Sequence, residues 1–568
     1  MPIPPTQLHT QLANFHSNRD GEKTTTLAKP PKTTTPFQKL QNSSSNPLPC
    51  LPRLPQFFRI NLWGNKLYQS AEIKLRRIHY SVRPSPLHPH KTMSISTLPL
   101  ANIYAEPTKQ QPRYDQLTKR FSELYAVSSP TLVRSPGRVN LIGEHIDYSH
   151  FSVMPMAIED DVIMAFSVGG DSIEIANMED DKFPAEKYNV PTADQVLTID
   201  QTKTVWTNYF KCGHTVGRKH LRDSGEEVKP VGIKVLVHGT VPDACGLSSS
   251  AAFVVCSTLV TLLSQGMQEV SRELLTRLSI TCEQLIGVNT GGMDQAASIY
   301  GQLNHTLLVD FAPTLKATPF QFPSTTPKTV FLVANTLVKS NKHETAPRNY
   351  NLRVVEITLA VNVLLKSLKG VTIPQNGNLN KGTLHGLMKA VDTDLHGLLD
   401  LVETLPKEPV TLQEVAGLLN VSEDDVKKQY FIFPVEFDTL ALYSRAKHVV
   451  TEAIRVKEFQ NLLSKGESDP RQLGKLMNES QKSCDQLFNC SCPAIDKVCD
   501  IVLNSGGFGS RLTGAGWGGS TVHLVEEAKL NNVIDALKKE YYSDMDGVDY
   551  DSAMVVTVPG EGCAIVDL

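Results

Sequence analysis

Hydrophobic residues recur with helical spacing in some stretches of the chain and form short apolar runs in others. Within 114–125, Leu117, Phe121 and Leu124 share one face, which is the spacing of an amphipathic helix. Similar spacing predicts further helices at 272–287, 440–463 and 530–541. Short runs rich in β-branched residues predict strands at 162–168, 232–237, 329–334, 521–525 and 553–558. This mixture, without a tandem repeat, predicts an α+β fold.

A strand, a loop of small residues and a helix follow one another between 233 and 263. The loop starts near Ala244 and leads to a helical apolar pattern that begins at Ala251. Serines 248, 249 and 250 occupy the expected start of the helix. A helix N-terminus presents backbone N–H groups that lack intrahelical partners, so this loop predicts an anion site whose usual ligand is phosphate. A serine-rich helix cap without a ligand is the alternative interpretation.

Five polar or ionisable residues lie among Val, Leu and Ile between positions 138 and 148. They are Arg138, Asn140, Glu144, His145 and Asp147. Neither a helical nor a strand period places them on one water-facing side, and burying them without partners would cost free energy. The cluster therefore predicts a site for a polar ligand. A surface hairpin with a local ion pair would also account for it.

A glycine-rich loop, Leu512–Gly519, precedes the predicted strand at 521–525. Its four glycines within six residues allow a ligand to approach the backbone closely. Turns are rich in glycine in general, so this loop indicates a binding site only in combination with the other two motifs.

In this order and at this spacing, the three motifs resemble those of the GHMP small-molecule kinases, and residues 137–148 resemble the galactokinase signature in particular. The similarity runs from about Arg113 to the C-terminus. It is closest to the fungal galactokinases, and the N-acetylgalactosamine kinases come next. Further segments that carry the resemblance are Asn208–Lys211, Gly291–Ser298 and Tyr350–Arg353.

The resemblance implies a two-lobed GHMP kinase fold with the active site between the lobes. It divides the chain into an N-terminal extension (1–92), an N-terminal kinase domain (93–325) and a C-terminal kinase domain (326–568). The extension carries 13 Lys and Arg residues against three acidic ones and is rich in Pro, Ser, Thr and Asn, which predicts disorder. A targeting segment, or a start placed upstream of Met93 in error, are the alternatives.

The resemblance also implies a reaction, the ATP- and Mg²⁺-dependent phosphorylation of O1 of α-D-galactose. Asp294 would accept the proton of that hydroxyl, and Arg138 beside it would keep the carboxylate ionised and offset developing charge. The residues implied in binding the sugar are Glu144, His145, Asp147, Gly291 through its backbone and Tyr350 through its phenol.

For the nucleotide, the resemblance implies that Trp206 and Asn208 line the adenine pocket. The residues implied in holding the phosphates are Gly246, Leu247, Ser248, Ser249 and Ser250. Ser250 would ligate magnesium, with Ser249 as the alternative, and Glu283 would supply a second oxygen. Core packing is the alternative role for Trp206, and an exposed helical carboxylate is the alternative for Glu283.

One position departs from the family pattern, because close relatives carry glycine where this chain has Ala244. If that position needs a positive φ angle, alanine would cost on the order of 1 kcal/mol and weaken ATP binding slightly.

Two other functions compete with galactose phosphorylation. An N-acetylgalactosamine kinase would need room beside the sugar C2. A galactose- and ATP-responsive regulator would bind a transcriptional repressor, with or without kinase activity. Composition predicts a cytoplasmic protein that binds neither membranes nor nucleic acid directly: the longest apolar runs are far short of the ~20 residues of a membrane helix. The ten cysteines show no zinc spacing, which predicts free thiols.

Overall fold

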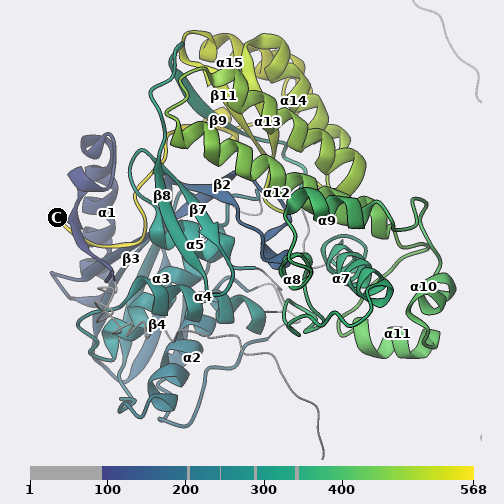
Figure 1. Cartoon of the computed structure of the whole chain (residues 1–568). Helices are drawn as coiled ribbons and strands as arrows, with labels where there is room; N and C mark the ends of the chain where they lie inside the picture. The colour runs from purple at the N-terminus through teal and green to yellow at the C-terminus, as the bar shows by residue number, and fades with distance from the viewer. Residues whose placement is uncertain (1–92, 201–204, 243–244, 287–290, 340–344) are drawn as a thin grey trace, which may run out of the picture. The chain divides into compact units, whose positions relative to one another are not determined.

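The computed structural model describes residues 93–568 apart from four short segments, 201–204, 243–244, 287–290 and 340–344 (Figure 1). All of the described residues belong to one unit of the chain, His88–Leu568. The predictions for the extension at 1–92 and for Ala244 lie outside the described residues.

A seven-stranded sheet carries the polar cluster of residues 138–148. Its strand order is β1-β13-β2-β3-β6-β4-β5. The two long strands β2 and β3 pair antiparallel, and β13 from the end of the chain lies between β1 and β2. The last strand of the chain therefore completes the first sheet. The strands are β1 (Thr97–Pro99), β2 (Thr131–Ile142), β3 (Met154–Val168), β4 (Ser172–Asn177), β5 (Glu186–Asn189), β6 (Ile233–Gly239) and β13 (Ala564–Asp567).

The helices of the first half of the chain bury their apolar faces against this sheet and against one another. On α1, Tyr114, Leu117 and Phe121 are fully buried. Leu124 is 41% exposed, contrary to its predicted place on the same face. Tyr125 takes that place instead: its ring packs against Phe121, and its hydroxyl donates to the Val235 carbonyl. The helices are α1 (Pro107–Tyr125), α2 (Thr207–Asp223), α3 (Ser249–Ser264), α4 (Arg272–Leu285) and α5 (Met293–Tyr300).

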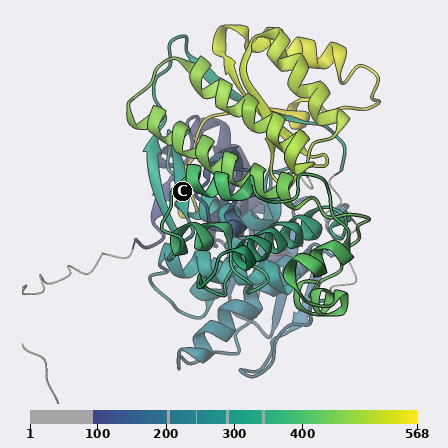
Figure 2. The ribbon, with the colours of Figure 1, turned by 45° about the vertical axis from the view of Figure 1, so that its right-hand side comes forward.

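A four-stranded antiparallel sheet of order β10-β11-β9-β12 organises the second half of the chain. Helices α13 and α14 pack against β10, and α15 packs against α14, so that the sheet and these helices lie together in both ribbon views (Figures 1 and 2). The elements are β9 (Thr329–Asn335), β10 (Gly507–Thr513), β11 (Ser520–Glu526), β12 (Met554–Thr557), α13 (Pro470–Ser483), α14 (Pro493–Ser505), α15 (Leu530–Glu540) and α16 (Tyr550–Ala553).

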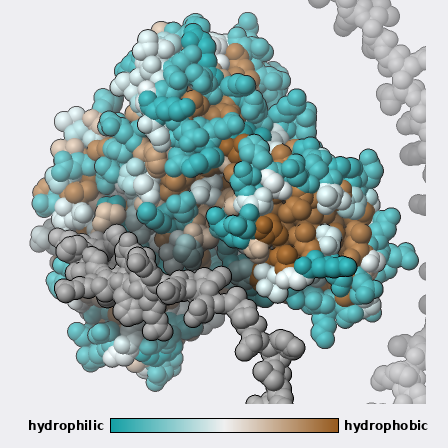
Figure 3. All heavy atoms as spheres, in the orientation of Figure 1, coloured by the Kyte–Doolittle hydropathy of each residue, from teal (hydrophilic) through white to brown (hydrophobic). Residues whose placement is uncertain are grey.

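Between β9 and α13 the described chain is mainly helical. Figure 3 shows hydrophobic side chains over these helices, and the exposed residues there include Leu418, Val421 and Ile432. The helices are α7 (Tyr350–Ser367), α8 (Leu384–Ala390), α9 (Leu395–Val402), α10 (Leu412–Leu419), α11 (Glu423–Tyr430) and α12 (Leu442–Ser464). The remaining elements are the hairpin β7 (His305–Asp310) and β8 (Lys316–Gln321), and the short turns η1 (Leu100–Asn102), η2 (Asp147–Ser149), η3 (Cys484–Phe488) and η4 (Glu527–Lys529).

One hydrophobic core joins β2 to the helices of the second half. It contains Val139 and Leu141 of β2, Val355 of α7 and Val449 of α12, all fully buried. α12 packs against α7, α9, α13 and β2. The polar cluster at the end of β2 is therefore fixed by elements from both halves of the chain. Within the described part of the chain, no helix is both long and apolar enough to span a membrane.

A buried carboxylate on β3 ties α1, β2 and the C-terminal segment together. Asp161 accepts hydrogen bonds from Arg134 Nε at 2.7 Å and from Arg113 Nη2 at 2.6 Å. Arg134 also donates to the Glu561 carbonyl at 2.6 Å, just before β13. Burial opposes ionisation of Asp161, but the charges of Arg113 and Arg134 outweigh it and lower its pKa. Each buried charge in this network therefore depends on the others.

We expect Asp161→Asn to lower the free energy of unfolding by about 3–5 kcal/mol, because it leaves two guanidinium groups without their counter-charge. Urea denaturation of the variant and the parent protein measures the difference. Asp171→Asn is the matched control, since Asp171 is exposed directly before β4. A loss below about 1 kcal/mol, the level of an exposed ion pair, would contradict this reading of the network.

Candidate active site

The loop between β6 and α3 forms the predicted helix N-terminus. Ser248 precedes α3 with a left-handed backbone, φ 62°, and the helix begins at Ser249. The Ser248 hydroxyl is buried and has no hydrogen-bond partner among the described residues. The first backbone N–H groups of α3 have no acceptor one turn earlier in the helix. A buried hydroxyl and converging N–H groups are suited to an anionic ligand.

Two oxygen atoms lie side by side next to this loop. The Ser250 hydroxyl donates to Glu283 Oε1 at 3.2 Å, from the last turn of α4. Glu283 is only 3% exposed, so the alternative of an exposed helical carboxylate is wrong. Hydroxyl and carboxylate oxygens are the hard ligands that Mg²⁺ takes in company with phosphates and water. Within the described ranges, no group of three or more His, Cys, Asp or Glu residues could hold a metal by itself.

Arg138 lies where the loop before α3, which includes Gly246, Leu247 and Ser248 and is called the phosphate loop below, meets α5. Its Nε donates to Asp294 Oδ1 at 2.8 Å, and its Nη1 donates to the Gly246 carbonyl at 2.6 Å. Asp294 lies in the first turn of α5, where the helix N-terminus also favours a negative charge. The guanidinium side chain is 2% exposed and the carboxylate side chain 13%. The structure thus brings together the two residues that the sequence paired, with the carboxylate the more open of the two.

Asp147 packs directly against Gly291. A Cβ atom on Gly291 would lie 2.4 Å from Asp147 Oδ2, so any larger residue would displace the carboxylate. Burial, and next the charge of Asp294, raise the pKa of Asp147 to about 7. The carboxyl groups of Asp147 and Asp294 therefore interact electrostatically, and the pKa of Asp147 lies near neutral pH.

His145 adopts a left-handed backbone, φ 60°, which directs its ring between aromatic side chains. The ring stacks on Phe488 at 4.6 Å and lies 5.7 Å from the ring of Tyr350. Its Nε2 contacts the Ala515 carbonyl at 2.9 Å, so the proton is on Nε2 and Nδ1 is an acceptor. Burial lowers the pKa of His145 to about 3, so the ring is neutral at physiological pH.

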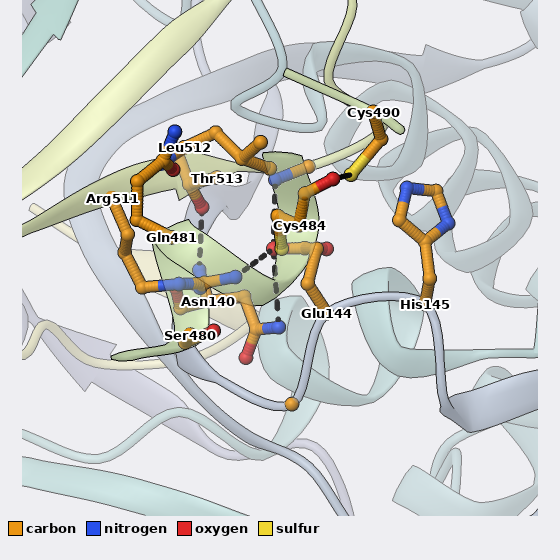
Figure 4. Close-up of polar contacts among 12 residues, drawn as sticks. Asn140, Glu144, His145, Ser480, Gln481, Cys484, Cys490, Arg511, Leu512 and Thr513 are labelled. Atoms are coloured by element: carbon orange, nitrogen blue, oxygen red, sulfur yellow. Dashed lines mark hydrogen bonds and ion pairs between the residues drawn. The ribbon is translucent and has the colours of Figure 1, made fainter. Parts of the chain in front are cut away.

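Glu144 is held by β10 and the glycine-rich loop (Figure 4). Its Oε2 accepts from Arg511 Nη2 at 3.1 Å, from the Gly514 N–H at 3.3 Å and from Asn140 Nδ2 at 3.4 Å. Burial raises the pKa of Glu144, although the charge of Arg511 opposes this shift. Sequence reasoning missed Arg511. No local feature of the sequence marked this residue, since its partner Glu144 lies 367 positions away in the chain.

The glycines of Leu512–Gly519 bring protein backbone, rather than a ligand alone, into close contact. A Cβ on Gly514 would lie 2.7 Å from the Gly246 carbonyl oxygen, which belongs to the phosphate loop. The Asn140 N–H donates to the Thr513 hydroxyl at 2.8 Å. The three motifs of the sequence therefore adjoin one another, and the third serves at least to pack against the first two.

Trp206 and Asn208 lie beside the start of α2. Trp206 Nε1 donates to the Pro184 carbonyl at 3.0 Å, and its ring contacts Phe253 of α3 edge-on at 5.9 Å. Trp206 stays partly exposed, so it is not a fully buried core residue. Asn208 is 5% exposed and donates to the Asp200 carbonyl at 3.0 Å. Phe253 lies one turn into α3, so its contact with Trp206 brings the Trp206 ring close to the helix that starts at the phosphate loop.

The fold is that of the GHMP kinases, and the matched families agree. Residues 208–302 match the family described as the GHMP kinases N terminal domain, and residues 457–543 match GHMP kinases C terminal. Residues 119–168 match the galactokinase galactose-binding signature.

Curated relatives identify the family within that class. The chain is 40% identical to a galactokinase of Saccharomyces cerevisiae, over 80% of this chain and 94% of the relative. It is 39% identical to a galactokinase of Schizosaccharomyces pombe, over 82% of this chain and 98% of the relative. The chain therefore belongs to the galactokinase family.

A solved structure shares the fold. The crystal structure of Lactococcus lactis galactokinase complexed with galactose matches with a TM-score of 0.59 and 21% sequence identity, over 80% of this chain and 99% of the other. The two-lobed GHMP kinase fold expected from the sequence is thereby confirmed.

The raised pKa of Asp147 makes stability depend on pH. Ionisation is disfavoured in the folded state, since the pKa rises from 3.8 to about 7. The stabilising contribution of the protonated form is complete below pH 3.8 and is lost as the pH rises through about 7. Without ligands, Asp147→Asn should therefore raise the melting temperature over the parent protein more at pH 8 than at pH 5, by several degrees.

Thermal unfolding at the two pH values measures this difference. The exposed Asp535→Asn on α15 is the control for removing one carboxylate outside the site. Equal effects of Asp147→Asn at pH 5 and pH 8 would show that the carboxyl group ionises normally in the folded protein.

Proposed function

We propose that this chain transfers the γ-phosphate of ATP to O1 of α-D-galactose and forms galactose 1-phosphate. The observation that carries the proposal is the position of Arg138, which donates both to Asp294 and to the Gly246 carbonyl of the phosphate loop. A base for a sugar hydroxyl and a cradle for phosphate are thus held by one side chain. In-line phosphoryl transfer needs this proximity between the attacking oxygen and the nucleotide.

The nucleotide phosphates would bind at the N-terminus of α3. Backbone N–H groups from Gly246 to Ser250 donate to the phosphate oxygens, and the Ser248 hydroxyl, unpartnered among the described residues, adds a donor. The adenine base would lie against Trp206 and beside Asn208. The contact between Trp206 and Phe253 of α3 supports this placement, because it puts the aromatic ring near the helix that holds the phosphates.

Ser250 and Glu283 would hold magnesium through the two oxygen atoms that lie 3.2 Å apart. In this class of reaction, the ion neutralises negative charge on the phosphates. The burial of Glu283 beside the Ser250 hydroxyl supports the assignment, since it holds a carboxylate oxygen next to the proposed phosphate site.

The sugar would bind among Glu144, His145, Asp147, the backbone of Gly291, and Tyr350. Neutral His145 offers Nδ1 as an acceptor, and the carboxyl groups accept from vicinal hydroxyls. Asp294 accepts the proton of O1. Arg138 keeps Asp294 ionised and stabilises the charge that develops on the attacking oxygen.

Four expectations from the sequence stay predictions. N-acetylgalactosamine remains the competing substrate, and the assay below includes it. A transcriptional repressor as a partner, and a cytoplasmic location, rest on the family resemblance and composition alone. The same holds for the division into domains at 325/326, although β13 of the second segment pairs with β1 and β2 of the first.

A coupled ADP-release assay over a panel of galactose, N-acetylgalactosamine and glucose tests the proposal. Galactose should be the fastest substrate. Asp294→Asn should lower kcat by at least about 100-fold while the protein stays folded, because the amide cannot accept the proton. Asp310→Asn, on β7, is the control and should keep full activity. Faster turnover of N-acetylgalactosamine would replace the proposed substrate, and an active Asp294→Asn would remove Asp294 as the base.

The magnesium assignment predicts a shift in metal dependence. Glu283→Gln should raise the Mg²⁺ concentration that gives half-maximal activity by about tenfold, because an amide oxygen is a weaker ligand than a carboxylate. Glu273→Gln, exposed at the start of the same helix, is the matched control. Mg²⁺ titrations at saturating galactose measure the change, and an unaltered titration curve would place the metal elsewhere.

A further inference from the structure

The turn that carries Glu144 and His145 has an unusual backbone. Gly143 has φ 105° and His145 has φ 60°, so left-handed residues stand on both sides of Glu144. Gly143 also passes close to β3: a Cβ there would lie 2.9 Å from Val153 Cα. Backbone in sparsely populated regions persists only when the surrounding structure holds it. Something must therefore secure this turn, which we call the Gly143–His145 turn.

Glu452 of α12 binds both amide groups at the start of the turn. Its Oε1 accepts from the Gly143 N–H at 2.8 Å and from the Glu144 N–H at 3.2 Å. The Ser480 hydroxyl donates to the same oxygen at 2.6 Å, and Arg455 Nε donates to Oε2 at 2.7 Å. Burial opposes ionisation, but the charges of Arg455 and Arg511 outweigh it and hold the pKa of Glu452 at about 2. The acceptor is thus a charged and fully buried carboxylate.

His448 lies one helical turn before Glu452 and binds the next polar group of the same backbone. Its Nε2 contacts the Glu144 carbonyl at 3.0 Å, and its Nδ1 contacts the Ser483 hydroxyl at 2.9 Å. Burial lowers its pKa to about 4, so the ring is neutral. Because a carbonyl only accepts, the single ring proton is on Nε2, and Nδ1 accepts from Ser483.

We infer that His448 and Glu452 are positioning residues for sugar binding. Four residues apart on α12, they face the same side of the helix and bind three polar groups of the turn's backbone: the Gly143 N–H, the Glu144 N–H and the Glu144 carbonyl. Neither side chain is offered as a contact to the sugar. Their effect is to fix where the Glu144 carboxyl group and the His145 ring point. This inference rests on the proposed function, since it takes the turn to be part of the galactose site.

His448 and Glu452 lie about three hundred positions after the Gly143–His145 turn in the sequence. Both belong to the helical second half of the chain. The nucleotide-binding groups proposed above come from α2, α3 and α4, and none of the contacts described for them involves α12. Loss of the contacts to the turn should therefore weaken the use of galactose and leave that of ATP nearly unchanged. If His448 and Glu452 only stabilised the fold, substituting them would lower stability and change the KM for galactose and for ATP alike.

The test compares three variants of the full chain in the ADP-release assay. His448→Leu removes the donor and should raise the KM for galactose by at least about tenfold, with the KM for ATP within twofold of the parent, because small displacements of binding groups weaken substrate use strongly. His448→Gln keeps an N–H donor near the position of Nε2 and should recover most of the loss. Glu452→Gln keeps the side-chain volume but weakens the acceptor and should raise the galactose KM by about threefold or more.

His523→Leu is the matched control, because His523 is also fully buried and bonds two hydroxyls, those of Ser510 and Thr521, within the second sheet. It should lower the melting temperature and leave both KM values unchanged. An unchanged galactose KM in Glu452→Gln, or equal changes for galactose and ATP in folded His448→Leu, would overturn the inference. If His448→Leu does not fold, Glu452→Gln decides alone. Failure of the proposed function is distinguishable, because the parent protein would then fail to turn over galactose.

Discussion

Arg138 has a buried positive charge, and the arrangement of the site follows from how that charge is satisfied. A guanidinium taken out of water costs several kcal/mol unless charged and polar partners replace its solvation. Arg138 finds them in Asp294, in the first turn of α5, and in the Gly246 carbonyl, in the loop before α3. The phosphate loop and the start of α5 are thereby fixed to the same strand, β2. The glycine-rich loop then packs against Gly246, so that all three motifs form one continuous surface.

Burial shifts the pKa values of the ionisable groups near Arg138 and elsewhere in the core. Nearby charges decide whether the net shift follows burial or opposes it. Burial raises the pKa of Glu144 and Asp147 and lowers that of His145. Asp161 and Glu452 behave oppositely, because each faces arginine side chains whose charge exceeds the effect of burial. Carboxyl groups held by arginines thus act as structural anchors. The carboxyl group of Asp147 instead keeps a pKa near neutrality, at a cost in stability that a binding site can tolerate.

Local patterns in the sequence predicted part of the secondary structure and several candidate site residues, whereas strands such as β2 and β10 and helices such as α7 and α13 were not predicted. The predicted strands and helices all occur, with ends shifted by a few residues or, for α1 and β3, with an earlier start. Leu124 was misplaced, because Tyr125 also fits the apolar face and forms the better contact with the sheet. The glycine-rich loop was read as room for a ligand, whereas its closest neighbours are other parts of the chain. A glycine pattern reports close approach but not what approaches.

By itself, the sequence determined the predicted elements, a helix start among Ser248–Ser250, and a polar cluster that contains Arg138, Glu144, His145 and Asp147. Asp294 joined this cluster through the family resemblance, and its contact with Arg138 comes from the structure. These conclusions rest on residues close together in the chain or on motifs whose order is informative. Tertiary structure alone decided which distant side chains hold that site. Arg511, His448 and Glu452 reach Glu144 and its backbone from more than three hundred residues away. An arginine in a strand or a histidine in an amphipathic helix has no local signature for such a role, because the partner is chosen by how the helices and sheets pack.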